Sequence, residues 1–220
     1  MVLFGMGLGG GMAVVVFAAL LAALAYLPFT HRDKTLWHSV LKTMPVAVFA
    51  GSAAVQGAPG LLVAGLALSA LGDWALSRPF ERAFMAGLVS FALAHLCYLG
   101  LFIGLVETWR ILPVILLIGF ALSSELWLAP FTGDMRWPVR VYVGLICAMV
   151  MAALSLPDLY RMASVGALLF MASDLILALQ MFRMLPDTKR ARWAGYTLWT
   201  LYILGQMTIL FAFVAVKPHG

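Results

Sequence analysis

The chain has 220 residues, of which 64% are hydrophobic and 10% are charged. Soluble domains are about 45–50% apolar and about 25% charged, so this composition excludes a water-soluble domain, a disordered chain and a disulfide-stapled secreted module. It predicts an all-α, polytopic membrane protein that forms a single integral membrane domain over residues 1–220. In such a chain the nine acidic residues are the most informative part of the sequence.

Eight apolar segments are long enough to predict membrane-spanning helices in one bundle, since about 20 residues cross the hydrocarbon core. Prolines fall at or near the segment ends, where helices tolerate them, with Pro45 at the start of the second segment. Residues 31–42 are polar and aromatic, which indicates an interfacial linker. In chain order the predicted helices are 8–28, 44–58, 59–77, 84–106, 110–129, 137–156, 158–182 and 192–215.

The basic residues divide unequally between the two sides of this threading, and the richer side should be cytoplasmic. Both termini then face away from the cytoplasm. The 14 Lys and Arg residues form no basic run, so the net charge of +5 does not indicate a nucleic-acid partner. Arginine outnumbers lysine ten to four, which is typical of a GC-rich bacterium, and we expect a bacterial inner membrane. The richer side holds Arg32, Lys34, Lys42, Arg78, Arg82, Arg136, Arg140, Arg183, Lys189, Arg190 and Arg192, against Arg110, Arg161 and Lys217 on the other.

Three acidic residues, Asp73, Glu125 and Asp174, fall inside predicted spans. A charged residue there costs about 2.5–3.5 kcal/mol on insertion scales, so such residues usually mark function. Glu125 lies about one turn from its helix end and can snorkel. The two aspartates have similar surroundings, LSALGDWAL and LFMASDLIL, on helices that run in the same direction. A tandem duplication of a four-helix unit would explain this similarity.

Other polar residues line single faces of helices, a pattern that ordinary helix packing also produces. His95 is the one histidine within a span, whereas a zinc hydrolase needs about three ligands, so no metal or other cofactor is expected. Hydrolase and phosphate-binding motifs such as GxSxG, HExxH and GK[ST] are absent, and Cys97 and Cys147 form no CxxC site. The stripes are Gly65, Ser69, Asp73 and Ser77; Phe84, Gly87, Phe91, His95, Tyr98 and Phe102; and Gly195, Trp199, Tyr202 and Gln206.

With these residues the chain resembles the YhhN-type lysoplasmalogenase family of integral membrane proteins, over about residues 42–206. Where the family often has adjacent Lys and Pro, two residues separate Lys42 from Pro45. The matching pieces are Lys42-Thr-Met-Pro45, Ser69-Ala-Leu-Gly-Asp73 with Leu76, Gly87-Leu88, Phe91, His95, Tyr98, Tyr142 with Met149, Gly166 to Asp174 with Ala178 and Phe182, and Tyr202 with Gln206.

The resemblance implies hydrolysis of the vinyl ether bond of lysoplasmalogens to a fatty aldehyde and a glycerophospho-base. Such cleavage needs one protonated carboxyl and a second group that stabilises positive charge or activates water, as in glycosidases. We expect Asp73 and Asp174 to be this catalytic pair if helices three and seven are neighbours, with the acid and base roles unassigned. The substrate-binding residues that we expect are Lys42 at the phosphate, and Ser69, His95, Tyr98, Ser173, Tyr202 and Gln206 in the polar lining.

Two other functions fit the same residues. Two intramembrane carboxylates also suit a proton- or cation-coupled transporter, although transporters more often break helices with Gly or Pro at the bilayer midplane. A non-catalytic membrane scaffold would tolerate alanine at both Asp73 and Asp174. The partners expected for the hydrolase are the lysophospholipid substrate and membrane lipids.

Overall fold

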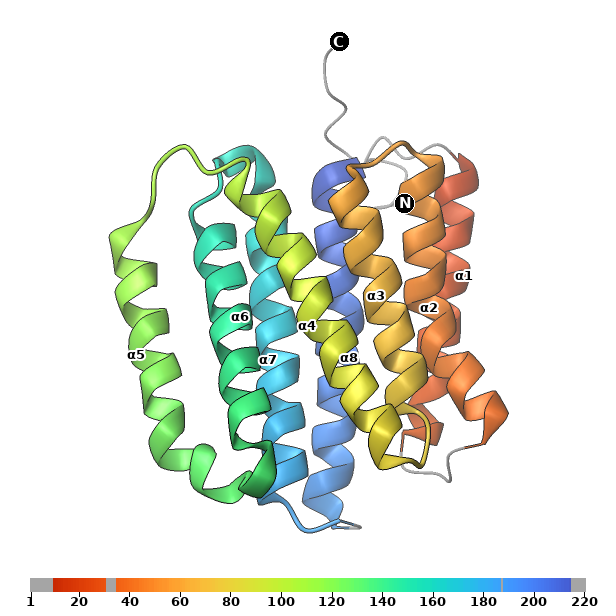
Figure 1. Ribbon diagram of the computed structural model, residues 1–220. Helices are drawn as coiled ribbons and strands as arrows, with labels where there is room; N and C mark the ends of the chain where they lie inside the picture. The colour runs from red at the N-terminus through yellow and green to blue at the C-terminus, as the bar shows by residue number, and fades with distance from the viewer. Residues whose placement is uncertain (1–9, 31–34, 187, 215–220) are drawn as a thin grey trace.

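Eight α-helices and four short 3-10 helices form the chain in the computed structural model, which describes residues 10–30, 35–186 and 188–214 (Figure 1). No strand occurs in these ranges. The helices confirm the predicted all-α bundle, and residues 8 and 9 of the first predicted span lie outside the described part. The helices are α1 (Gly10–Tyr26), α2 (Leu36–Val55), α3 (Gly60–Leu76), α4 (Glu81–Ile103), α5 (Ile111–Trp127), α6 (Arg136–Leu154), α7 (Arg161–Arg183) and α8 (Lys189–Val214).

Five helical stretches are long and apolar enough to cross a membrane, and they contain α4 to α8. Two apolar helical stretches are shorter, namely Val14–Phe29, which covers most of α1 and the 3-10 helix after it, and α3. Helix α2 is not among the five. The chain is therefore an integral membrane protein by length and composition, with five of the eight predicted spans supported in this way. The relation of the two halves by duplication stays a prediction.

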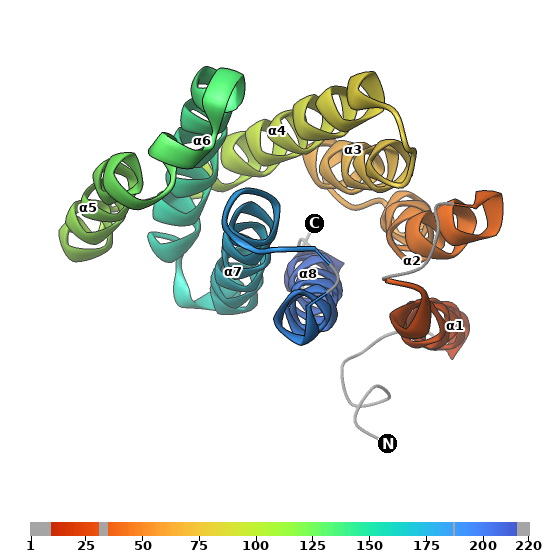
Figure 2. The same cartoon turned by 90° about the horizontal axis from the view of Figure 1, so that it is seen from below.

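Helix α8 lies inside the arc formed by α1 to α4, with α7 beside it and α5 outermost (Figure 2). Its most apolar stretch is 61% buried, whereas that of α5 is 17% buried. The most extensive contacts join α7 with α8 and α3 with α4. Side chains on α8 can therefore reach both halves of the bundle, while α5 packs mainly on α6.

Glycines allow the closest helix pairs to approach. A Cβ on Gly166 of α7 would lie 2.7 Å from the carbonyl oxygen of Gly205 on α8. A Cβ on Gly65 of α3 would lie 2.6 Å from the Tyr98 ring on α4, and one on Gly72 would lie 2.6 Å from the Phe91 ring. Small residues at membrane helix interfaces permit such close packing, and here they make room for the rings of Tyr98 and Phe91.

Helix α2 begins earlier than predicted, so the proposed interfacial linker is wrong for residues 36–42. The Thr35 hydroxyl accepts the His38 backbone N–H at 3.2 Å, which caps the helix. His38 and Ser39 are buried, and His38 Nε2 lies 3.0 Å from the Tyr26 hydroxyl of α1. His38 thus packs against α1, and Ser39 donates its hydroxyl to the Thr35 carbonyl, so these polar side chains do not face the membrane surface.

Pro45 lies in the interior of α2, not near its end as predicted. Proline lacks an N–H and cannot complete the helical hydrogen bond, which typically kinks a helix. The first turns of α2 indeed lie at an angle to the remainder (Figure 1). Pro45 therefore removes part of the sequence-based case against a transporter.

The loops alternate between the two ends of the bundle as the charge analysis requires. The α3–α4, α5–α6 and α7–α8 connections define one end, which we call the basic end, and Gly10 and Val214 lie at the other (Figure 1). Arg32, Lys34 and Lys217 lie outside the described residues. At or near the basic end are Arg78, Arg82, Arg136, Arg140, Arg183, Lys189, Arg190 and Arg192, with Arg110 and Arg161 at the opposite end.

Glu125, the third acid within a span, pairs with two arginines of α6. Both of its carboxylate oxygens accept hydrogen bonds from Arg140, at 2.7 and 2.5 Å, and Arg136 lies 3.7 Å away. The Glu125–Arg140 pair links α5 to α6, the helix against which α5 mainly packs. The position of Glu125 within a span thus has a structural explanation.

Candidate active site

Asp73 lies near the end of α3 in a closed cluster with residues of α2 and α8. Tyr202 donates its hydroxyl to Asp73 Oδ2 at 2.7 Å, and Lys42 Nζ lies 3.8 Å from Oδ1. The Asp73 side chain is 3% exposed and that of Lys42 is 16% exposed. Lys42 therefore pairs with the predicted catalytic carboxylate, whereas the sequence suggested that it would meet a substrate phosphate.

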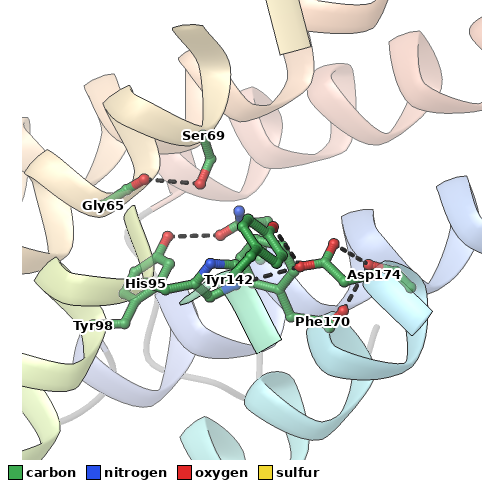
Figure 3. A network of polar contacts seen from close by, with 9 residues as sticks. Gly65, Ser69, His95, Tyr98, Tyr142, Phe170 and Asp174 are labelled. Atoms are coloured by element: carbon green, nitrogen blue, oxygen red, sulfur yellow. Dashed lines mark hydrogen bonds and ion pairs between the residues drawn. The ribbon is translucent and has the colours of Figure 1, made fainter. Parts of the chain in front are cut away.

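Asp174 on α7 has a separate set of partners (Figure 3). Tyr142 of α6 donates its hydroxyl to Asp174 Oδ2 at 2.7 Å, and His95 Nε2 of α4 lies 3.5 Å from the same oxygen. Ser173 Oγ lies 3.5 Å from Oδ1 and donates to the Phe170 carbonyl at 2.7 Å. The Asp174 side chain is 12% exposed, so it is more open than Asp73.

A third polar contact links α4 to α8 deeper in the bundle. The Tyr98 hydroxyl donates to Gln206 Oε1 at 2.7 Å, and both residues are fully buried (Figure 3). Ser69 donates instead to the Gly65 carbonyl of its own helix at 2.8 Å. Gln206 Nε2 is buried without a hydrogen-bond partner. Buried polar atoms are usually paired, so this region retains hydrogen-bonding capacity.

Aromatic rings lie between the two aspartate clusters. Phe170 contacts Tyr202 at 5.4 Å and His95 at 4.7 Å between ring centroids, which connects the partner of Asp73 to the partner of Asp174. The two carboxyl groups share no hydrogen bond, since Asp73 Oδ2 accepts from Tyr202 and Asp174 Oδ2 accepts from Tyr142. The bundle therefore brings the predicted site residues into one region but keeps the aspartates out of direct contact.

An apolar pocket of about 780 Å³, including the space at its open side, lies among α4, α5, α6 and α7. Its polar wall residues are Asp174, Tyr142 and Ser124, and Asp73 does not line it. The two aspartates thus differ in access, since Asp174 faces a space that a ligand can occupy.

Tyr142 is the clearest site residue that the sequence analysis did not assign. It appeared there only as a matching piece of the resemblance. Tyr142 shares a helical face with Ile146 and Met149, which are buried. A tyrosine hydroxyl on such a face needs a partner, and that need was the available signal. Within the described residues no three His, Cys, Asp or Glu side chains form a group that could hold a metal ion.

Replacing Tyr142 by phenylalanine should lower kcat about 10- to 100-fold, with little change in KM, in the vinyl ether hydrolysis that the family resemblance implies. The hydroxyl orients Asp174, and a displacement of a reacting group by about 1 Å can cost about 100-fold in rate. The edge-to-face contact with the His95 ring, at 5.2 Å, remains in the variant. Steady-state kinetics on purified protein measure the split, and an unchanged kcat would show that this hydrogen bond does not position Asp174.

The comparisons with known proteins identify relatives that match most of the chain, including the helices of the candidate site. The YhhN family model matches residues 37–213. Lysoplasmalogenases of Mycobacterium bovis and Mycobacterium tuberculosis are each 36% identical over 131 residues, covering 55% of this chain and 49% of theirs. Human lysoplasmalogenase TMEM86B is 36% identical over 157 residues, covering 69% of this chain and 66% of its own.

This chain thus spans about half the length of the mycobacterial relatives that it matches. No solved structure matches it significantly. The family match includes α3, α4, α6, α7 and α8, the helices that carry Asp73, Asp174 and most of their partners. The chain therefore belongs to the YhhN family.

Proposed function

We propose that this protein is a membrane-embedded hydrolase that cleaves the vinyl ether bond of lysoplasmalogens. The observation that carries the proposal is a carboxyl group, Asp174, in the wall of a largely apolar pocket. Its relatives named lysoplasmalogenase support the same activity, and the comparisons lend no support to a coupled transporter.

The reaction requires acid catalysis at carbon. A proton moves from a carboxyl group to the β-carbon of the vinyl ether, whose π electrons form the new C–H bond. The positive charge on the α-carbon is shared with the ether oxygen, and this oxocarbenium ion resembles that of glycoside hydrolysis. Water adds to the α-carbon and returns a proton to the carboxylate. The hemiacetal then breaks its bond to the glycerol oxygen, which takes up the hydroxyl proton, and the products are a fatty aldehyde and a glycerophospho-base.

Asp174 is the proton donor in this scheme because it faces the pocket. Tyr142 fixes the orientation of its carboxyl through the 2.7 Å hydrogen bond, and His95 lies beside the same oxygen. Ser173 contacts the second oxygen. A general acid must lie within reach of the atom that it protonates, and Asp174 meets this condition because it lines the pocket.

Asp73 acts at a distance as a fixed negative charge that favours the cationic intermediate. Lys42 and Tyr202 hold its carboxylate in place, while Tyr98 and Gln206 hold α4 against α8. Ser69 donates its hydroxyl to a carbonyl of its own helix α3. This assignment gives the two aspartates different roles, which the sequence left open.

Replacing Asp73 by asparagine should lower kcat about 100-fold, the scale of losing one preorganised electrostatic group. The amide oxygen can still accept the Tyr202 hydroxyl, so the helix packing should persist. Aldehyde release and thermal unfolding are measured on the same preparation. A variant that unfolds normally yet keeps full activity would remove Asp73 from the chemistry.

The proposed activity is tested with purified protein and three lysolipids that differ only in the linkage of the chain: vinyl ether, saturated ether and ester. We expect aldehyde from the vinyl ether alone. Release of fatty acid from the ester, without aldehyde from the vinyl ether, would indicate a phospholipase and contradict the proposal.

We also propose that the basic end of the bundle is cytoplasmic and that the membrane is a bacterial inner membrane. The excess of Lys and Arg at that end supports the orientation. Both chain ends would then face away from the cytoplasm. Cysteine labelling at positions 82 and 110 from either side of sealed cells tests this orientation, and labelling of position 82 only from outside would reverse it.

A further inference from the structure

We infer that the apolar pocket among α4 to α7 binds the single hydrocarbon chain of the substrate and thereby presents the vinyl ether to Asp174. The inference rests on the proposed function, and it adds a binding site, its occupant and the surface that positions the reacting carbon.

The lining of the pocket favours a hydrocarbon chain over a headgroup. Its wall is built from aromatic and aliphatic side chains, among them Phe91, Phe120 and Trp127. The Ser124 hydroxyl already donates to the Ala121 carbonyl at 2.7 Å, and Tyr142 donates to Asp174. Among the residues that the structure describes, no cationic side chain lines the wall. A phosphate in this space would lose its hydration without compensation, whereas a hydrocarbon chain has no hydration shell to lose.

The outer wall of the pocket is held at the basic end. Phe120, Ser124 and Trp127 of α5 face the pocket, and the Glu125–Arg140 pair ties α5 to α6. Arg183 of α7 donates to the Trp127 carbonyl at 2.6 Å. Helix α5 packs extensively only against α6, and these contacts fix its position. The pocket therefore keeps a defined shape, although its outer wall is the least buried of the five membrane-spanning stretches.

The pocket contributes position more than affinity. A lipid chain leaves one apolar medium, the bilayer, for another, so its transfer releases little free energy. Its value lies in holding the double bond against the carboxyl, because displacement of a reacting atom by about 1 Å can cost about 100-fold in rate. Filling the pocket should therefore affect turnover more strongly than binding.

Ala178 offers a direct way to fill it. Ala178 lines the pocket four residues after Asp174, one turn away on the same face of α7. Replacing Ala178 by phenylalanine should lower kcat/KM at least tenfold for long-chain lysoplasmalogen and much less for a short-chain analogue. Ala18→Phe on α1, at an exposed position, is the matched control and should change neither. Equal activity of Ala178→Phe and wild type on the long chain would overturn the inference.

A binding measurement separates this inference from the proposed function and does not depend on whether Ala178→Phe folds. A saturated-ether lysolipid with a brominated chain cannot be cleaved as a vinyl ether, yet its bromine quenches tryptophan fluorescence at contact. We expect quenching in the wild-type protein that is reduced in Trp127→Phe and exceeds the quenching by a brominated two-chain phosphatidylcholine.

Equal quenching of Trp127 by the two brominated lipids would mean that bulk bilayer covers the pocket, and this would overturn the inference. Selective quenching without any vinyl ether hydrolysis would support the chain site and refute the proposed activity. The two failures are thus distinguishable on one preparation.

Discussion

Replacing Asp174 by asparagine should lower aldehyde release about 100- to 10,000-fold, the range of general acid catalysis. Asparagine keeps the shape of the side chain and an oxygen that accepts the Tyr142 hydroxyl, but it cannot donate a proton to carbon. The loss should appear in kcat and kcat/KM together, because the interaction is made in the transition state. Single-turnover assays on the purified variant measure it.

The matched control is Glu125→Gln, which removes the third carboxyl group within a span. Glu125 pairs with Arg140 and Arg136 and does not line the pocket. We expect this variant to lose far less turnover than Asp174→Asn, because Glu125 only ties the outer wall of the pocket to α6 and cannot reach the substrate. Full activity of Asp174→Asn would refute the assignment of the acid, and equal losses in both variants would point to a general effect of charge removal.

Replacing Gly166 by alanine should have the largest effect on the fold. The added Cβ would meet the Gly205 carbonyl oxygen at 2.7 Å and the Ile209 backbone nitrogen at 2.9 Å. Backbone cannot yield as a flexible side chain can, so α7 and α8 must separate. Overpacking of this kind costs about 1–3 kcal/mol, and activity should fall as well because α8 carries Tyr202. Thermal unfolding in detergent measures the loss.

Gly144→Ala on α6 serves as its control. A Cβ at Gly144 meets nothing within 4 Å, so alanine should leave the unfolding temperature unchanged or raise it. Equal unfolding temperatures for Gly166→Ala and wild type would show that the α7–α8 interface does not depend on the glycine contact.

Much of the fold follows from composition and periodicity. Apolar length alone predicts eight helices, because the bilayer sets the length of each span. The prediction was wrong for residues 36–42, which are helical although they are polar, because a polar side chain can pack against a neighbouring helix, as His38 does against Tyr26. The start of α2 therefore depends on a tertiary contact that no local sequence pattern contains. Because the helix begins earlier than predicted, Pro45 lies in its interior.

The candidate site shows the same division between local and tertiary information. Scarcity of charge singled out Asp73 and Asp174, and the cost of burying a carboxylate made them informative. Sequence could not distinguish them, because both lie on apolar helices after a small residue. The difference arises from packing, since α2 supplies Lys42 to Asp73 while the space among α4 to α7 opens on Asp174. Lys42, for which the sequence suggested contact with the substrate phosphate, pairs in the structure with the Asp73 carboxylate.

The most direct test of the account is cleavage of lysoplasmalogen in heavy water, with each aldehyde molecule reduced to the alcohol as it is released. Protonation of the β-carbon by a fixed carboxyl predicts one deuterium on the carbon adjacent to the former carbonyl, in a single configuration. Deuterium in equal amounts of both configurations, or an aldehyde without deuterium at that carbon, would contradict proton delivery by Asp174 to a chain held in the pocket.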